Sequence, residues 1–300
     1  MLGAIEAGGT KFVCAVADGN LNIKARVRIP TATPEESIPQ ILLFFSHYQL
    51  EGIGIGAFGP IGVNPDSPDY GFVRQTPKPG WTNFDFLGTI SSYVDCPVYW
   101  TTDVNVAAYG ELKRGSAQGL NEVVYLTVGT GIGGGIIHDG KIYSGYSHPE
   151  VGHIAVRPPL IERDNFRGVC PYHDFCLEGM AAGPAIAARA GRPATELGAH
   201  DVAWQIEAYY LAQAAVDYTL MFAPERIIFG GGVSNQKQLY HLIRESFTTQ
   251  LHGYVQTPPE NEYLVHAGLG DDAGITGALL LASQVARNQD AAAKYHVYKT

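Results

Sequence analysis

The chain has 300 residues, of which 46% are hydrophobic and 16% charged, and its formal net charge at pH 7 is −9. This length can bury a core in one large or two medium domains, and the acidic balance argues against a nucleic-acid partner, since Lys113-Arg114 is the nearest approach to a basic cluster. No apolar run approaches the roughly 20 residues that span a bilayer, and the N-terminus lacks a targeting segment, so the sequence predicts a soluble, cytosolic (cytoplasmic) protein with no membrane partner.

The first half of the chain alternates short apolar runs with glycine-containing turns. Gly8-Gly9 separates two of these runs and predicts a β-hairpin, while a Thr-Pro pair followed by two glutamates is typical of a helix start. The expected elements are strands over 2–7, 11–17, 22–30, 51–58 and 96–102, helices over 33–48 and 104–114, and a long loop over 59–84. Loops of that length in compact domains are often functional.

The second half opens in the same way, with a strand over 121–128 that meets a Gly/Thr turn and a further strand. Ala7–Thr10 therefore has a counterpart in Val128–Gly131, and this echo predicts duplicated α/β domains that face each other. A helix over 201–222, a strand over 225–230, a helix capped by Ser234 and a final helix over 273–285 complete the expected order.

Two glycine motifs imitate well-known nucleotide sites. Residues 129–134 match G-x-G-x-x-G, but a dinucleotide site needs a helix next and the following run predicts a strand. Residues 135–142 approach a P-loop, but Ile142 stands where Ser or Thr would hold magnesium. Both interpretations are rejected. Three glycine turns, at 8–11, 129–134 and 230–232, instead favour a nucleotide between two domains, because glycine lets backbone N–H groups approach phosphate oxygens.

Five motifs carry a resemblance to a known family: I-E-A-G-G-T-K-F-V-C-A, T-D-V-N-V-A-A-Y-G-E, L-T-V-G-T-G-I-G-G-G, H-P-E-V-G-H and F-G-G-G-V. From residue 2 to about 285 the sequence resembles the sugar kinases of the ROK family (repressor, open reading frame, kinase). E-A-G-G-T-K and the T-P-K-P-G-W loop at 76–81 are most similar to its bacterial fructokinases. The resemblance implies an α/β, actin-like (ribonuclease-H-like) ATPase fold with two similar domains around a cleft, ATP, Mg2+ and a homodimer.

On this fold, we expect an N-terminal α/β domain over 1–115, with the C-terminal helix 273–286 packed on it. A C-terminal α/β domain would cover 116–272 and carry a zinc loop over 153–178.

The resemblance also implies roles for individual residues. Asp103 matches the catalytic base, although from its residue type alone it could be only a helix cap. The residues expected to bind ATP are Gly8, Gly9, Thr10, Lys11, Thr130, Gly131, Pro184, Gly231, Gly232, Asn235 and Gln236. Those expected to contact the sugar are Thr102, Asp103, Glu150, His153 and Glu178.

Three of these positions leave alternatives open. Carboxylates such as Glu150 and Glu178 can each accept two sugar hydroxyls, but solvated surface positions are the alternative. Thr102 stands where glucose kinases have Asn, which counts against glucose. Many family members have Asp at the position of Glu6, which could reach magnesium through water or be an ordinary charge at a strand end.

The segment 151–178 has few residues to bury, and a metal could order it instead. His153, Cys170, His173 and Cys176 supply two nitrogen and two sulfur ligands, which suit tetrahedral Zn2+, and a closed site of this kind is structural. The family that the sequence resembles usually has three cysteines and one histidine here, so the resemblance implies that His173 takes the place of one cysteine. We expect His153 to serve zinc through one ring nitrogen and the sugar through the other. The alternative is two unrelated thiols and two surface histidines.

The sequence thus predicts an ATP-dependent fructokinase, an ATP:hexose 6-phosphotransferase that makes fructose 6-phosphate. One alternative is a kinase for mannose, glucose or an N-acyl hexosamine, and another is a non-catalytic sugar sensor. A sugar-responsive repressor of the same family is disfavoured, because such proteins carry an N-terminal helix-turn-helix domain and this chain opens in the nucleotide hairpin.

Overall fold

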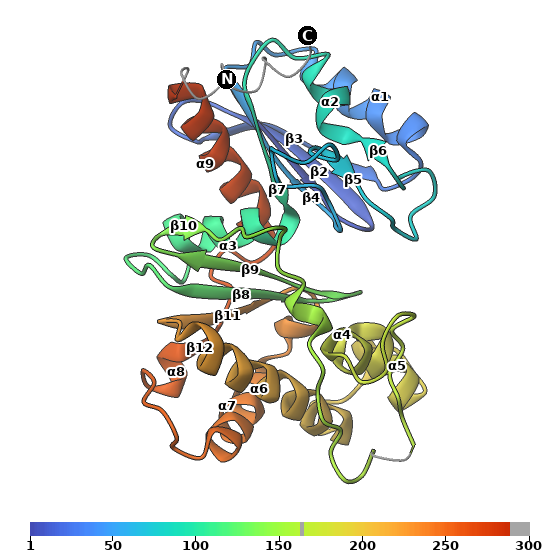
Figure 1. Cartoon of the computed structure of the whole chain (residues 1–300), viewed down its shortest axis with the longest axis vertical. Helices are drawn as coiled ribbons and strands as arrows, with labels where there is room; N and C mark the ends of the chain where they lie inside the picture. Colours follow the sequence, from blue (N-terminus) through green and yellow to red (C-terminus); the bar gives the residue numbers. More distant parts are fainter. Residues whose placement is uncertain (163–164, 289–300) are drawn as a thin grey trace. The chain divides into compact units, whose positions relative to one another are not determined.

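The computed structural model describes residues 1–162 and 165–288, which form two compact units, each built on a five-stranded sheet (Figure 1). The first unit comprises Met1–Arg114, Tyr143–His148 and the described residues from Asp272 onward, and the second comprises Gly115–Ile142 and Pro149–Asp271. The short segment 143–148 therefore belongs to the first unit, although in the sequence it lies between two parts of the second.

The two sheets have the same connectivity. In the first unit, β1 (Leu2–Ala7), β2 (Lys11–Ala17) and β3 (Ile23–Pro30) are antiparallel, and β4 (Gly52–Ala57) and β7 (Val98–Thr102) extend β1 in parallel. In the second unit, β8 (Val123–Val128), β9 (Ile132–His138) and β10 (Lys141–Ile142) are antiparallel, and β11 (Arg226–Gly230) and β12 (Leu264–His266) extend β8 in parallel. The echo in the sequence thus marks a repeated topology, which confirms the expected duplication.

Helices cover both faces of the first sheet (Figure 1). On one face, α3 (Asp103–Arg114) and α9 (Ala273–Arg287) pack against each other and against β1 and β4. Their backbones approach so closely that a Cβ added to Gly277 would lie 1.7 Å from the carbonyl oxygen of Val106, so only glycine fits there. On the other face, α1 (Pro34–Phe45) and α2 (Phe86–Ser91) cover an apolar core.

The segment 59–84, expected as a loop, is partly ordered by a buried tryptophan. It contains β5 (Phe72–Val73) and ends in β6 (Phe84–Asp85), which pair as a small antiparallel sheet. Trp81 is fully buried, and its ring meets those of Phe12 and Phe58 nearly edge-on, with centroid distances of 5.4 and 5.5 Å. Its indole N–H donates to the carbonyl of Ala32 at 2.7 Å. The tryptophan therefore fixes this loop on the end of the β1–β2 hairpin.

The second unit has five α-helices in its described residues: α4 (Leu177–Ala181), α5 (Gly183–Ala190), α6 (Val202–Phe222), α7 (Lys237–Leu251) and α8 (Glu260–Tyr263). The expectation that Ser234 caps a helix was wrong, because Val233–Asn235 forms a separate 3₁₀ turn and Ser234 is buried within it. Across the part of the chain that the structure describes, none of the helices combines the length and apolarity of a membrane span.

Candidate active site

Asp103 is the first residue of α3, directly after β7. The capping role lies one residue earlier, because the side-chain oxygen of Thr102 accepts the backbone N–H of Asn105 at 3.2 Å. Asp103 is half-buried, and its Oδ1 accepts the N–H of Val104 at 2.9 Å. Because Thr102 caps the helix, the interpretation of Asp103 as only a cap loses its basis. Thr102 itself is buried, and its contact with sugar stays a prediction.

The first glycine turn joins β1 to β2, where the N–H of Gly8 donates to the carbonyl of Lys11 at 3.0 Å. Within the described residues, the N–H groups of Gly9 and Thr10 donate to no backbone carbonyl or side chain, so they are available for an anion. β1, β4 and β7 are parallel neighbours, so this turn and Asp103 lie at the same edge of the sheet. Two strand spacings separate them by roughly 10 Å.

The second glycine turn follows β8, and residues 129–131 close it through a hydrogen bond from the N–H of Gly129 to the carbonyl of Gly131 at 2.9 Å. A strand, β9, follows the turn, as the sequence predicted when a dinucleotide site was rejected. The N–H of Gly183, at the start of α5, donates to the carbonyl of Gly129 at 2.8 Å. Pro184 follows and is exposed. Thr130, Gly131 and Pro184 therefore lie close together.

The third glycine turn follows β11, which is the parallel neighbour of β8. Gly231 has a positive φ of 85°, and a Cβ there would lie 2.5 Å from the carbonyl oxygen of Val128, so the turn needs glycine. Just beyond it, Oδ1 of Asn235 lies 3.1 Å from Nε2 of His266, and Gln236 accepts a hydrogen bond from Gln238 at 3.0 Å. The second unit thus brings all its predicted nucleotide residues to one edge of its sheet.

Glu178 connects the second glycine turn to the metal loop. Its Oε2 accepts the N–H of Ile132 at 2.9 Å, and its Oε1 lies 3.9 Å from Nε2 of His153. Gly131 gives it room, because a Cβ there would lie 2.6 Å from Oε2. Two predicted sugar ligands and a predicted phosphate turn are therefore in direct contact.

Glu150 is the second carboxylate expected to bind sugar, and it precedes the 3₁₀ turn Val151–His153. The residue as a whole is exposed. Partial desolvation of its carboxyl, together with the nearby carboxylate of Glu178, raises the pKa of Glu150 to about 7. The group therefore changes charge near neutral pH.

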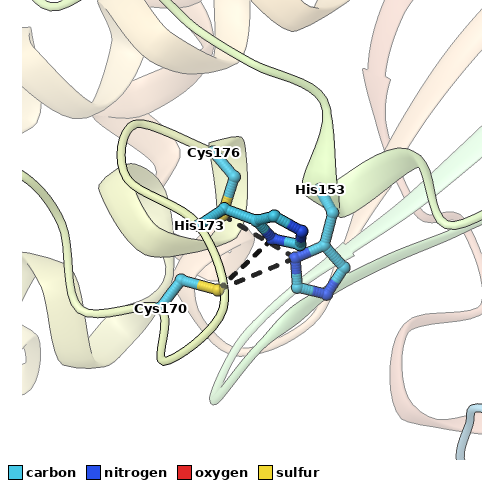
Figure 2. A group of neighbouring side chains, drawn as sticks. All are labelled: His153, Cys170, His173 and Cys176. Carbon is cyan, nitrogen blue, oxygen red and sulfur yellow. Dashed lines mark hydrogen bonds between the residues drawn. The ribbon is translucent and has the colours of Figure 1, made fainter.

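The four residues predicted to bind zinc converge on one point (Figure 2). Their ligand atoms all lie within 4.8 Å of one another. Nδ1 of His153 is 3.9 Å from the sulfur of Cys170 and 3.7 Å from that of Cys176. Nδ1 of His173 is 3.7 Å from the sulfur of Cys170.

These distances fit a tetrahedral metal. Zn–S bonds of about 2.3 Å and Zn–N bonds of about 2.0 Å at the tetrahedral angle separate sulfur from nitrogen by about 3.5 Å. The donor set of two imidazoles and two thiols also matches the ligands that zinc prefers. Because His153 offers Nδ1 to the cluster, its Nε2 is left facing Glu178. The chain's own residues thus fit the ion.

A buried charged cluster beneath α4 was not predicted from the sequence. Arg189 of α5 forms an ion pair with Glu162 and donates to the carbonyl of Met180 at 2.7 Å. Tyr210 donates to the other oxygen of Glu162 at 2.8 Å. Glu207, fully buried on α6, lies within electrostatic reach of both Arg189 and Glu162. Since Met180 belongs to the helix that carries Glu178, this cluster supports the predicted sugar site.

Glu6, whose role the sequence left open, lies at the end of β1 in the first unit. A Cβ added to Gly274 would lie 2.4 Å from the carboxyl carbon of Glu6, so this carboxylate sits against the N-terminal turn of α9. That position favours a negative charge, because the helix dipole is positive at its N-terminus.

Comparison with known proteins agrees with this architecture. The profile of the ROK family matches residues 2–285. A fructokinase of Pediococcus pentosaceus is 49% identical over 96% of this chain and 99% of its own, and one of Streptococcus mutans is 43% identical over 95% and 98%.

Among solved structures, a ROK family glucokinase from Streptomyces griseus, in complex with glucose and AMPPNP, is 27% identical, with a TM-score of 0.71 over 93% of this chain and 98% of its own. The predicted actin-like α/β fold is thereby confirmed. The chain belongs to the ROK family of sugar kinases.

Proposed function

We propose that the protein is an ATP-dependent fructokinase that phosphorylates the 6-hydroxyl of fructose. The observation that carries the proposal is the identity to relatives named fructokinase, 49% and 43% along nearly the whole chain, against 27% for the glucokinase. Thr102 supports the choice of sugar, because its buried hydroxyl is engaged in capping α3 and offers no amide to a glucose hydroxyl.

Asp103 is the general base in this proposal. The 6-oxygen of fructose attacks the γ-phosphorus of ATP, the bond from that phosphorus to the bridging oxygen of ADP breaks, and the hydroxyl proton passes to the Asp103 carboxylate. The products are ADP and fructose 6-phosphate, and the proton then leaves to water. The open N–H groups of Gly9 and Thr10, at the same sheet edge as Asp103, bind phosphate oxygens.

In the second unit, two glycine turns and three side chains are proposed to bind the substrates. The turns at 129–131 and 231–236 bind the nucleotide, and Glu150, His153 and Glu178 bind fructose hydroxyls. Mg2+ would be held by the phosphate oxygens of ATP and by water, and it would supply positive charge that neutralises the phosphates. Zn2+ in the Cys2His2 cluster is structural and fixes the ring of His153, whose Nε2 faces Glu178.

A sugar panel tests the proposed activity. ADP formation is measured in a coupled assay with fructose, mannose, glucose and two N-acetylhexosamines, and the phosphorylated position is assigned by NMR. We expect kcat/KM for fructose to exceed that for every other sugar by at least about tenfold, with the phosphate on oxygen 6. A higher kcat/KM for another hexose would overturn the substrate, and no ATP turnover with any sugar would overturn the kinase.

We also propose a cellular location and an oligomeric state for the protein. An ATP-dependent kinase needs ATP, so we place it in the cytoplasm. The homodimer implied by the family resemblance stays a prediction, which light scattering of the purified protein tests.

A further inference from the structure

Lys78 lies beside the first glycine turn but was not among the residues predicted to bind ATP. It belongs to the T-P-K-P-G-W stretch, and a Cβ added to Gly9 would lie 3.4 Å from its Cε and 3.6 Å from its Nζ. The ammonium group therefore stands next to the turn whose N–H groups are open to an anion.

The loop that carries Lys78 is held in place by a buried tryptophan and by its own hydrogen bonds. Trp81, three residues later, is buried against Phe12 of β2, and its backbone N–H donates to the carbonyl of Lys78 at 3.2 Å. The N–H of Lys78 donates to the hydroxyl of Thr76 at 3.4 Å, and Thr82 closes the loop by donating to the Thr76 carbonyl at 3.0 Å. The backbone of Lys78 is thus set before any ligand binds, which lowers the entropy cost of using its side chain.

The ammonium has no protein partner to explain this position. In residues 1–162 and 165–288, Nζ of Lys78 makes no hydrogen bond or ion pair, although the side chain is half-buried. Lys24 of the same unit, in contrast, forms an ion pair with Asp18 at 2.8 Å. A half-buried cation beside open N–H donors makes a site for an anion that carries several charged oxygens.

We propose that Lys78 binds the γ-phosphoryl group of ATP and stabilises the charge that develops as this group is transferred. The inference rests on the proposed kinase activity and adds a catalytic residue to it. The turn beside Lys78 lies at the same sheet edge as Asp103. The cation therefore lies at the edge where a phosphoryl group would pass to the hydroxyl that Asp103 deprotonates. Fixed cations at such oxygens are a principal source of rate enhancement in phosphoryl transfer.

The kinetic test compares Lys78→Met, which keeps the length of the side chain without its charge, with Lys78→Arg and the matched control Lys24→Met. We expect Lys78→Met to lower kcat by about 100-fold or more while KM for fructose changes little. Lys78→Arg recovers part of the lost kcat, and Lys24→Met leaves it unchanged. A kcat for Lys78→Met within about twofold of wild type would overturn the proposal, as would a loss confined to KM for either substrate.

A binding test separates this inference from the proposed function. Calorimetry with AMPPNP and with ADP needs no turnover, and Lys78→Met should weaken AMPPNP binding while leaving ADP binding unchanged. Equal effects on both nucleotides would contradict a γ-phosphoryl contact. If the wild-type protein phosphorylates no sugar, the proposed function fails, yet the difference between AMPPNP and ADP still decides the role of Lys78. Circular dichroism of each variant checks that it is folded.

Discussion

Replacement of Glu207 by Gln should stabilise the protein increasingly as pH rises. Glu207 is fully buried on α6, and within the described residues neither of its carboxyl oxygens has a hydrogen-bond partner. Burial raises the pKa of this carboxyl well above its usual range; Arg189 opposes that effect and Glu162 adds to it. The group is therefore protonated in the folded protein at pH values where the unfolded chain is ionised.

The sign and size of the effect follow from proton linkage. A raised folded-state pKa means that the folded state binds more protons, so the free energy of unfolding falls as pH rises above the unfolded value of about 4.3. The contribution is about 1.4 kcal/mol for each pH unit, for as long as the folded carboxyl stays protonated. Over the pH range in which the folded carboxyl keeps its proton, wild type should therefore lose stability that Glu207→Gln does not lose.

Urea unfolding followed by circular dichroism at a series of pH values measures this difference, with hydrogen exchange of the α6 amides as a local readout. Glu196→Gln, at an exposed position of the same unit, is the matched control and should follow wild type. If the stability difference between Glu207→Gln and wild type stays constant from pH 5.5 to 7, the carboxyl does not hold its proton in the folded state and the reasoning fails.

Three further results are expected. Removal of the metal with a chelator should raise KM for fructose on the order of 10- to 100-fold and loosen the loop that carries the metal ligands, and Cys170→Ser should do the same. Metal analysis, kinetics and hydrogen exchange measure these effects. An unchanged KM and an unchanged loop would contradict the link between the metal and the sugar site. Because the pKa of Glu150 is about 7 and only its ionised form accepts two hydroxyls, kcat/KM for fructose should fall as pH drops below 7. Glu150→Gln should remove this fall from the pH profile. If the fall persists in the variant, Glu150 is not its source. Gly277→Ala should cost about 1–3 kcal/mol of stability in thermal unfolding, since its Cβ would lie 1.7 Å from the carbonyl oxygen of Val106; an unchanged melting temperature would refute the packing argument.

The elements that the sequence predicted correctly are those with a strong local pattern. The hairpin around Gly8 and the strand that ends at Thr102 were expected from alternating or continuous apolar runs bounded by turn residues, and both are present. The repeated strand order was foreseen because the two glycine turns occupy equivalent places in the two halves.

The features that the sequence missed depend on contacts between distant residues. Trp81 orders the segment 59–84 through a hydrogen bond to the carbonyl of Ala32 and a ring contact with Phe12. No local sequence pattern indicates those partners. Arg189 was not singled out from the sequence, because the residue that it pairs with, Glu162, lies 27 residues away in the chain. The predicted cap at Ser234 failed because the turn after Gly231 continues for one more 3₁₀ turn before α7 begins.

The metal cluster was predicted in part by spacing and in part by resemblance. Cys170, His173 and Cys176 follow one another at intervals of three residues, which is a local signal. The fourth member, His153, lies 17 residues before Cys170, outside that local spacing, and it was added because it completes a set of two nitrogen and two sulfur ligands. The contact of Glu178 with the N–H of Ile132 had no signal in the sequence.

The role of Asp103 is tested most directly by the single-turnover rate of phosphoryl transfer from ATP to fructose in Asp103→Asn, measured with both substrates saturating. We predict that the rate falls by at least about 100-fold, while the affinities for ATP and fructose, determined by calorimetry, stay close to those of wild type. A rate that remains near the wild-type value would show that another group accepts the hydroxyl proton, and the proposed mechanism would be wrong.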